Sequence, residues 1–309
     1  MAAYLVTGGA GFIGSHLCDA LIGRGDRVRV LDDLSTGHLS NLPAGVAFIE
    51  GNIADPAAAQ TAMEGMDGCF HLAAIASVER GVIDWTGTHR VNLTGTIVLM
   101  DAIRRQGSKI PMVYASSAAV YGDCQTIPIH EDCERRPLSA YGADKLGCEL
   151  HAGVASHVHG IPTVGLRFFN VYGPRQDPGS PYTGVISTFC ERIGRDAPIV
   201  IYGDGVQTRD FVHVSDVVAA LLAGMALRPT GAPVFNVCTG VATSVLDLAH
   251  LIASLVGNRL DRSFQPPRSG EIRHSLGDPT RLRATLNAGD PTQLRDGLKE
   301  VLGWMSICR

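Results

Sequence analysis

The sequence predicts an α/β fold built on a doubly wound parallel sheet, with a smaller, discontinuous C-terminal α/β substrate lobe. Two observations predict this fold. The first is that short apolar strand patterns, at 4–6, 28–31, 46–49, 68–72 and 112–115, alternate with helical patterns that begin near Phe12 and lie at 57–66 and 91–106. Such alternation is typical of parallel sheets whose helices cover both faces. The second is the glycine-rich turn between the first strand and the first helix.

This turn carries glycine at positions 9, 11 and 14, directly after the apolar strand pattern at 4–6. In the G-x-G-x-x-G spacing, the glycines permit a tight turn, a close approach of the backbone to a pyrophosphate, and close packing of helix on strand. The helix beginning near Phe12 then directs its free N–H groups and its positive dipole end at the phosphates. We therefore expect a Rossmann-type dinucleotide site, although glycine-rich turns also arise for structural reasons alone.

An acid pair, Asp32 and Asp33, ends the next strand pattern about 20 residues beyond the glycines. A carboxylate at this place accepts a hydrogen bond from a ribose 2′-hydroxyl and repels the 2′-phosphate of NADP. The expected cofactor is therefore NAD. A solvated pair of acids in a turn before Gly37 is the simpler alternative.

Composition excludes several classes of function. The 309 residues carry a formal net charge of −4 without long charged runs, so neither nucleic acid nor an anionic membrane is expected as a partner. The cysteines lie far apart with no C-x-x-C, which argues against a metal site or a disulfide scaffold. The longest apolar run, at 217–227, is shorter than the about 20 residues that span a bilayer, and the N-terminus lacks the features of a secretory signal. We expect a reduced, cytoplasmic protein.

The candidate chemistry lies on a strand end and on one helix. Strand 112–115 runs into Ser116 and Ser117, and a helix that starts after Pro137 and closes at Gly160 carries Tyr141 and Lys145. Residues four apart share one helix face, so the lysine cation lies near the tyrosine hydroxyl. At ~4 Å and an effective dielectric of ~20, such a cation stabilises a tyrosinate by up to about 4 kcal/mol. A tyrosinate takes a proton from a sugar hydroxyl.

Two further polar residues lie near the expected site. His71, in the apolar strand at 68–72, is interpreted as a packed and hydrogen-bonded residue rather than as a metal ligand or acid/base group. Asn92, on the first turn of the helix at 91–106, is a candidate to brace the active site.

These motifs resemble those of extended short-chain dehydrogenases/reductases, in the nucleotide-sugar epimerase/dehydratase family, and most closely those of UDP-glucose (UDP-galactose) 4-epimerases. The matching segments are 7–17, 32–33, 92, 116–122, 141–145, 166–176 and 202–217. The resemblance implies that Tyr141 is the base, that Lys145 binds the nicotinamide ribose and promotes ionisation of the tyrosine, and that Ser117 assists proton transfer at the sugar 4-hydroxyl. It also implies a 4-keto intermediate, and a homodimer through the helices at 91–106 and 139–159.

The resemblance implies two sets of binding residues. Those for NAD are Gly8, Gly11, Phe12, Ile13, Gly14, Asp32, Asp33, Thr36, Gly37, Asn52, Ile53, Leu72, Ala73, Ala74, Asn92, Ser116, Tyr141, Lys145 and Phe168. Those for the UDP-sugar are Ser117, Tyr141, Asn170, Gly184, Val185, Val200, Tyr202, Arg209, Arg268, Glu271 and Ser275. Asn52 and Phe168 depart from the family pattern, in which Asp and Tyr are frequent at these places. Either change adjusts NAD affinity.

The expected division of the chain is an NAD-binding domain at 1–173 plus about 206–240, and a nucleotide-sugar lobe at about 174–205 and 241–309. Uronate 4-epimerases stay open as an alternative within the family. Dehydratases and uronate decarboxylases are disfavoured, because Ala118 and Ala119 stand where those enzymes carry acids. An alternative of another class, a dinucleotide-sensing regulator without catalysis, typically loses the tyrosine or the lysine, and both are present here.

Overall fold

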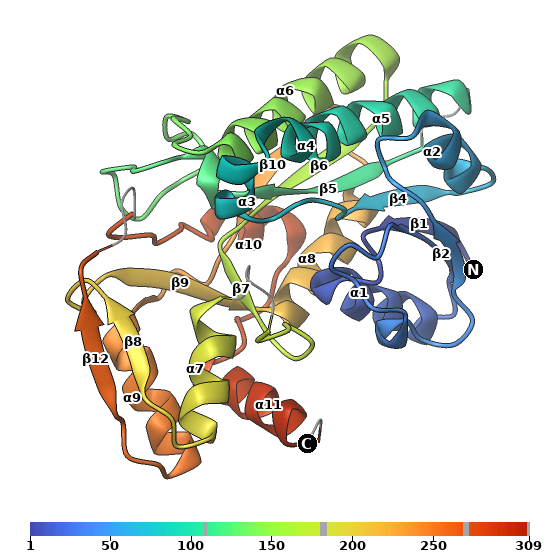
Figure 1. Cartoon of the computed structure of the whole chain (residues 1–309). Helices are drawn as coiled ribbons and strands as arrows, with labels where there is room; N and C mark the ends of the chain where they lie inside the picture. Colours follow the sequence, from blue (N-terminus) through green and yellow to red (C-terminus); the bar gives the residue numbers. More distant parts are fainter. Residues whose placement is uncertain (108–109, 180–183, 268–271, 308–309) are drawn as a thin grey trace.

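The computed structural model of the chain describes residues 1–107, 110–179, 184–267 and 272–307. Its centre is a seven-stranded sheet in the order β10-β6-β5-β4-β1-β2-β3, in which every pairing is parallel (Figure 1). The strands are β1 (Ala3–Thr7), β2 (Arg27–Asp32), β3 (Ala47–Glu50), β4 (Gly68–His71), β5 (Met112–Ser117), β6 (Thr163–Phe168) and β10 (Val234–Val237). The predicted α/β fold with a doubly wound parallel sheet is therefore confirmed.

Helices cover both faces of this sheet. On one face α1 (Phe12–Gly23), α8 (Val214–Leu227) and α10 (Thr280–Leu286) pack into a core that includes Leu17, Leu221 and Leu282. On the other face α2 (Pro56–Met63), α5 (Gly95–Arg105) and α6 (Ala140–His159) pack into a second core that includes Leu99 and Cys148. The chain order reverses between β1 and β4, and ligands of open α/β sheets bind at the carboxyl ends of the strands beside such a switch point.

Smaller elements form a third core beside the large sheet. β7 (Asn170–Tyr172), β9 (Thr208–His213) and β11 (Ala242–Ser244) make a three-stranded sheet, and β8 (Ile199–Tyr202) pairs with β12 (Arg262–Gln265). Three helices, α7 (Val185–Gly194), α9 (Val245–Val256) and α11 (Leu294–Ile307), pack around this third core. Figure 1 shows these elements below and to one side of the large sheet. The boundaries of the two expected domains stay a prediction.

The helix expected at 91–106 differs in detail from its prediction. Helical structure begins earlier, with α3 (Val78–Ile83) and α4 (Trp85–His89), and passes through a π-helical turn, η2 (Arg90–Thr94), before α5. In this turn the carbonyl of Asn92 accepts the Thr96 hydroxyl at 2.6 Å and the Cys148 thiol at 3.4 Å. Apolar spacing carries no signal for these side-chain bonds. Turns of this kind are frequent at functional sites.

The helix α6 begins and ends as its sequence predicts. The Ser139 hydroxyl accepts the N–H of Gly142 at 3.1 Å and caps the first turn. At the other end Gly160 adopts φ 66°, the left-handed conformation that glycine permits at a helix terminus. Two short 3₁₀ turns, η1 (Leu39–Asn41) and η3 (Ala118–Val120), complete the described elements.

Candidate active site

A cavity of about 410 Å³ lies at the carboxyl edge of the large sheet. Of the residues expected to bind NAD, those that line it are Gly8, Gly11, Phe12, Ile13, Gly14, Asp32, Asp33, Thr36, Ile53, Leu72, Ala73, Ala74, Ser116, Tyr141, Lys145 and Phe168. The described lining residues do not include Gly37, Asn52 or Asn92. Two of these are bonded to lining residues: Asn52 to Asp33, and Asn92 to Ile75. The geometry therefore gathers segments that lie far apart in the sequence around one space.

The glycine-rich turn brings backbone close to the start of α1. A Cβ on Gly14 would lie 2.2 Å from the carbonyl oxygen of Gly8, so a side chain at this position would force the helix away from the turn. The N-cap of α1 is Gly11, which has no side chain to satisfy the N–H groups of the first turn. These donors and the helix dipole suit a pyrophosphate.

The acid pair supports the turn and faces the cavity. Asp32 is buried, and its carboxylate accepts the N–H groups of Ala10 and Leu34, each at 2.9 Å. Burial raises the pKa of Asp32 above its usual value, and the two hydrogen bonds only partly offset this rise. Asp33 accepts the Asn52 amide at 3.1 Å, which orients the second carboxylate. Each carboxylate retains acceptor capacity for a ribose hydroxyl. The N–H groups at the start of α1, which no side chain caps, and these acceptors both fit NAD.

The candidate catalytic residues come from two elements. Tyr141 and Lys145 lie one turn apart on α6, with the ammonium nitrogen 5.8 Å from the centroid of the tyrosine ring. The Lys145 ammonium is buried and donates to the carbonyl of Ala115 at 2.8 Å, which ties α6 to β5. Ser117, at the end of β5, accepts the N–H of Ala119 at 3.1 Å and keeps its own hydrogen to donate. All three predicted catalytic side chains line the same cavity.

His71 is buried beneath this cavity and makes a hydrogen bond with each ring nitrogen. The Thr7 hydroxyl already accepts two backbone N–H groups, so it donates to Nδ1 of His71 at 2.7 Å. The Thr96 hydroxyl donates to the Asn92 carbonyl, so it accepts from Nε2 of His71 at 2.9 Å. Burial, and then the charge of Lys145, lowers the pKa of His71 to about 3. The residue is a neutral, packed histidine, as interpreted from the sequence.

Asn92 braces the edge of the cavity. Its side-chain oxygen accepts the N–H of Ile75 at 2.8 Å, and its side-chain nitrogen donates to the carbonyl of Ile75 at 3.1 Å. Because Ile75 lines the cavity, this pair of bonds holds the loop that follows β4. Asn92 therefore acts on the cavity through Ile75, which is the indirect, supporting role expected from the sequence.

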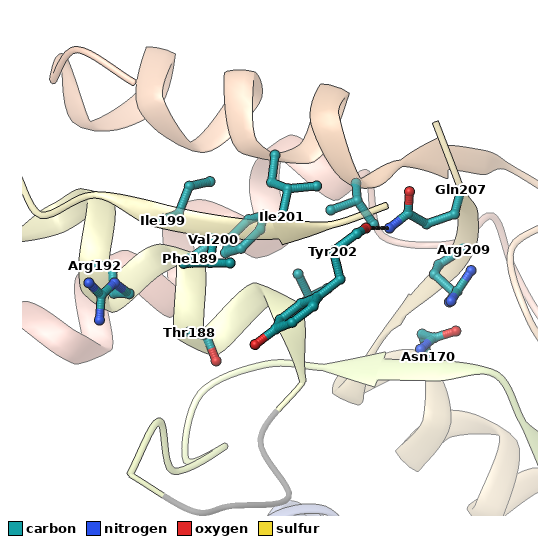
Figure 2. Close-up of a pocket in the computed structure, with 12 residues that line it drawn as sticks. Asn170, Thr188, Phe189, Arg192, Ile199, Val200, Ile201, Tyr202, Gln207 and Arg209 are labelled. Carbon is teal, nitrogen blue, oxygen red and sulfur yellow. Dashed lines mark hydrogen bonds between the residues drawn. The ribbon is translucent and has the colours of Figure 1, made fainter. Parts of the chain in front are cut away.

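A second cavity, of about 470 Å³, lies between α7, β8 and the start of β9 (Figure 2). Residues expected to bind the UDP-sugar that line it are Asn170, Val185, Val200, Tyr202 and Arg209. Figure 2 shows Asn170 and Arg209 together at one end, with Thr188 and Arg192 toward the other. Asn170 lines both cavities, and Gly184 lines the first, so the two spaces adjoin.

Several residues of this second cavity carry no recognisable signal in the sequence. Thr188 and Arg192 lie one turn apart on α7, and Gln207 donates to the carbonyl of Tyr202 at 2.7 Å. Helical spacing places Thr188 and Arg192 on one face, but only the packing of α7 beside β8 shows that this face lines a cavity.

The cavities leave three expected sugar-nucleotide residues unplaced. Arg268 and Glu271 lie outside the described residues. Ser275 is half-buried, donates its N–H to the carbonyl of Thr208 at 3.1 Å, and is not among the described lining residues of either cavity.

The described residues contain no group of three or more His, Cys, Asp or Glu side chains placed to hold a metal ion. In the same part of the chain, no helix combines the length and the apolar character needed to cross a membrane.

Comparison with known proteins identifies close structural and sequence relatives. The UDP-glucose 4-epimerase of Mycolicibacterium smegmatis is 37% identical over 305 residues, covering 96% of each chain. The crystal structure of a UDP-glucose 4-epimerase with UDP-glucose, from Thermotoga maritima, superposes with a TM-score of 0.95 at 35% identity, covering 99% of each chain. The UDP-glucose 4-epimerase of Thermus thermophilus in complex with NAD superposes with a TM-score of 0.90 at 34% identity, covering 98% of this chain and 99% of that one.

Other relatives act on other sugars. One solved structure, 33% identical, is a UDP-N-acetylglucosamine 4-epimerase. Further relatives are a UDP-glucuronate 4-epimerase at 30% identity and a UDP-N-acetyl-alpha-D-glucosaminuronate decarboxylase at 32% identity. Identity at this level does not distinguish between these sugars. The NAD dependent epimerase/dehydratase family matches residues 4–238, and the chain therefore belongs to this family of enzymes, with NAD as its cofactor.

Proposed function

We propose that the protein catalyses the NAD-dependent 4-epimerisation of UDP-glucose and UDP-galactose, and of their N-acetyl forms, through a 4-keto intermediate. The observation that carries the proposal is the meeting of Ser117, Tyr141 and Lys145 in one cavity, joined at Asn170 to a second cavity with Arg209. The first cavity suits a cofactor and a sugar, and the second suits a nucleoside diphosphate.

In this proposal Tyr141 is the base that takes the proton of the sugar 4-hydroxyl. Lys145, whose ammonium nitrogen lies 5.8 Å from the centroid of the tyrosine ring, holds a positive charge beside this base. Ser117 donates a hydrogen bond to the sugar oxygen and so stabilises the charge that develops there as the proton moves to Tyr141. NAD bound in this cavity would supply the hydride acceptor for C4 and the hydride donor for its reduction. Tyr141 returns its proton to the same oxygen when the hydroxyl re-forms.

The second cavity anchors the nucleotide while the sugar turns. An epimerase must present both faces of the 4-keto sugar to the same cofactor, so the diphosphate has to stay bound as the sugar rotates. Asn170 and Arg209 lie together at one end of the cavity (Figure 2), where an amide and a guanidinium suit phosphate oxygens. Val200 and Tyr202 supply the apolar wall on which a uracil ring packs. Arg268 and Glu271 complete this site in the proposal.

The UDP-glucuronate 4-epimerase reaction is the second candidate within the family. A uronate carries a carboxylate on C5, and guanidinium groups suit carboxylates. Among the described residues that line the catalytic cavity, Lys145 is the cationic side chain, and it is already bonded to the Ala115 carbonyl. This favours a neutral hexose.

A dehydratase is disfavoured by the acids of the same cavity. Among the described lining residues these are Asp32 and Asp33, at the end of β2, whereas Ala118 and Ala119 follow Ser117.

We also propose that the protein is a cytoplasmic homodimer, formed through the outer faces of α5 and α6. Four apolar side chains are exposed there. They are Ile97, Leu150, Val154 and Val158, with exposed fractions of 37%, 62%, 52% and 62%. The last three follow one another at helical spacing along α6, so they form one stripe. A second copy of the chain that packs α5 and α6 against their counterparts covers this stripe.

A substrate panel tests the proposed activity. Purified protein is incubated with UDP-glucose, UDP-galactose, UDP-GlcNAc, UDP-GalNAc and UDP-glucuronate, and the products are identified by chromatography and NMR. Interconversion of the first two sugars supports the proposal, and conversion of UDP-glucuronate alone contradicts it. A non-catalytic regulator binds NAD and converts none of them.

The Tyr141→Phe variant tests the base. Removal of the hydroxyl should lower kcat by about 10²- to 10⁴-fold while binding of the UDP-sugar stays largely intact. Tyr4→Phe, which removes a hydroxyl from β1 where the ring packs on Phe70, is the matched control and should keep its activity. Near wild-type turnover by Tyr141→Phe contradicts the mechanism.

A further inference from the structure

A buried ion pair lies directly behind the catalytic residues. Arg167, on β6, is 2% exposed and is the largest fully buried side chain of the described chain. Its Nε and Nη2 donate to the two carboxylate oxygens of Glu149, on α6, at 2.8 and 2.7 Å. Burial by itself lowers the pKa of Arg167, but the hydrogen bonds and charge of Glu149 raise it above its usual value. Arg167 is therefore charged in the folded protein, and it is paired with the Glu149 carboxylate.

The pair is bonded to the catalytic strand on one side and to a loop on the other. The Ser116 hydroxyl donates to Oε1 of Glu149 at 2.5 Å. Nη1 of Arg167 donates to the Tyr121 hydroxyl at 2.6 Å and to the carbonyl of Glu131 at 2.9 Å. Each charged oxygen and nitrogen thus has a partner, as a buried ion pair requires. The cluster joins α6, β5, β6 and the loop that follows β5.

The bonds form two successive links between α6 and β5. Lys145 holds Ala115 through its ammonium, and Glu149, one turn further along α6, holds Ser116 through its carboxylate. Ser117 is the next residue of β5. Because Ala115 and Ser116 are both bonded to α6, the place of Ser117 relative to this helix is fixed, and Ser117 lines the same cavity as Tyr141. Tyr141 lies one turn before Lys145 on the same helix.

We infer that Glu149, held by Arg167, is a positioning residue for the reaction: through Ser116 it fixes the end of β5 against α6 and so sets the separation of the Ser117 and Tyr141 hydroxyls. The inference rests on the proposed function, because it concerns the groups that transfer the sugar proton. A misplacement of about 1 Å lowers a rate by about 10²-fold. A buried ion pair is weak evidence of a contribution to protein stability, because its replacement by apolar side chains is often neutral or stabilising. Positioning therefore explains the pair better than stabilisation of the fold does.

Two variants separate positioning from stability. Ser116→Ala removes the link and leaves Glu149 bonded to Arg167. The double variant Glu149→Leu/Arg167→Met removes both charges and retains apolar volume, so its thermal midpoint should equal or exceed that of Ser116→Ala. In both, kcat for UDP-galactose should fall about 10- to 100-fold, while KM and the calorimetric Kd for UDP stay within about two-fold of wild type.

Thr239→Val is the control. It removes the hydroxyl that donates to the buried Asp210 carboxylate at 2.7 Å, a bond that does not reach β5. Its thermal midpoint should fall while kcat stays at the wild-type value. Wild-type kcat in Ser116→Ala, or in a double variant that folds, overturns the inference while the proposed function stands. If the double variant does not fold, Ser116→Ala decides alone. A wild-type protein that is inert on every sugar of the panel contradicts both proposals.

Discussion

Replacement of Gly14 by alanine tests the close approach of α1 to the glycine-rich turn. The added Cβ would lie 2.2 Å from the carbonyl oxygen of Gly8 and 2.7 Å from the Cα of Gly9, whereas ordinary contact begins near 3.4 Å. The helix must therefore move by about 3.4 − 2.2 = 1.2 Å, because both obstructing atoms belong to backbone. Overpacking of this kind costs about 1 to 3 kcal/mol. The expected fall in the thermal midpoint is about 2 to 10 °C.

The same movement should weaken NAD binding. The N–H groups of the first turn of α1 move with the helix, and a lost hydrogen bond to a charged group costs about 1.5 to 3 kcal/mol. We expect the Kd for NAD, measured by calorimetry on protein freed of cofactor, to rise about 10- to 100-fold.

Gly23→Ala is the matched control on the same helix. An added Cβ at Gly23 meets no atom within 4 Å, and alanine is favoured over glycine in a helix by about 0.5 to 1 kcal/mol. The thermal midpoint of this variant should stay level or rise, and its Kd for NAD should not change. If Gly14→Ala matched wild type in both measurements, close packing against Gly8 would not be the reason for glycine at this position.

Three further predictions concern the sugar, the buried histidine and the dimer. We propose that Ser275 borders the C2 substituent of the sugar, so Ser275→Tyr should lower kcat/KM for UDP-GlcNAc about 10-fold or more while UDP-galactose is spared; equal loss on both sugars would contradict this placement of Ser275. Because burial lowers the pKa of His71 to about 3, the native state stays neutral while the unfolded chain takes up a proton below its usual 6.5. The free energy of unfolding should therefore fall by about 1.4 kcal/mol for each pH unit below 6.5. Denaturant unfolding between pH 6.5 and 4.5 should show this pH dependence in the wild type and not in His71→Asn. Val154→Glu should shift the mass found by light scattering from dimer to monomer, and a wild-type monomer would contradict the proposed interface.

The fold and the cofactor were predictable because their signals are local. The glycine spacing, the acid after β2 and the tyrosine and lysine one turn apart on α6 each lie within one turn or element, where backbone geometry relates spacing directly to position. Pro137 and Gly160 are signals of the same kind, and α6 begins and ends between them as predicted. Such patterns need no knowledge of which elements become neighbours.

The π-helical turn and the second cavity were not predictable in this way. In the turn the Asn92 carbonyl accepts bonds from side chains of α5 and α6, and contacts with a second helix carry no signal in the spacing of one helix. The cavity face of α7 depends on how that helix packs beside β8. Gln207 and Thr188 belong to elements that meet only in the folded chain.

The buried pair of Arg167 and Glu149 shows what sequence patterns omit and why the omission matters. Each charge in isolation predicts a solvated surface residue, because an unpaired charge is costly to bury. The cost of burial is offset only where the two charges meet and Ser116 adds a third partner. The two residues lie 18 positions apart in the sequence and on different elements, so their pairing has no local signal. Motif reading therefore identifies groups that touch the substrate, such as Ser117 and Tyr141, since these lie at strand ends or on one helix face. The residues that set the separation of those groups are identified by bonds between elements, and in this protein those bonds converge on Glu149.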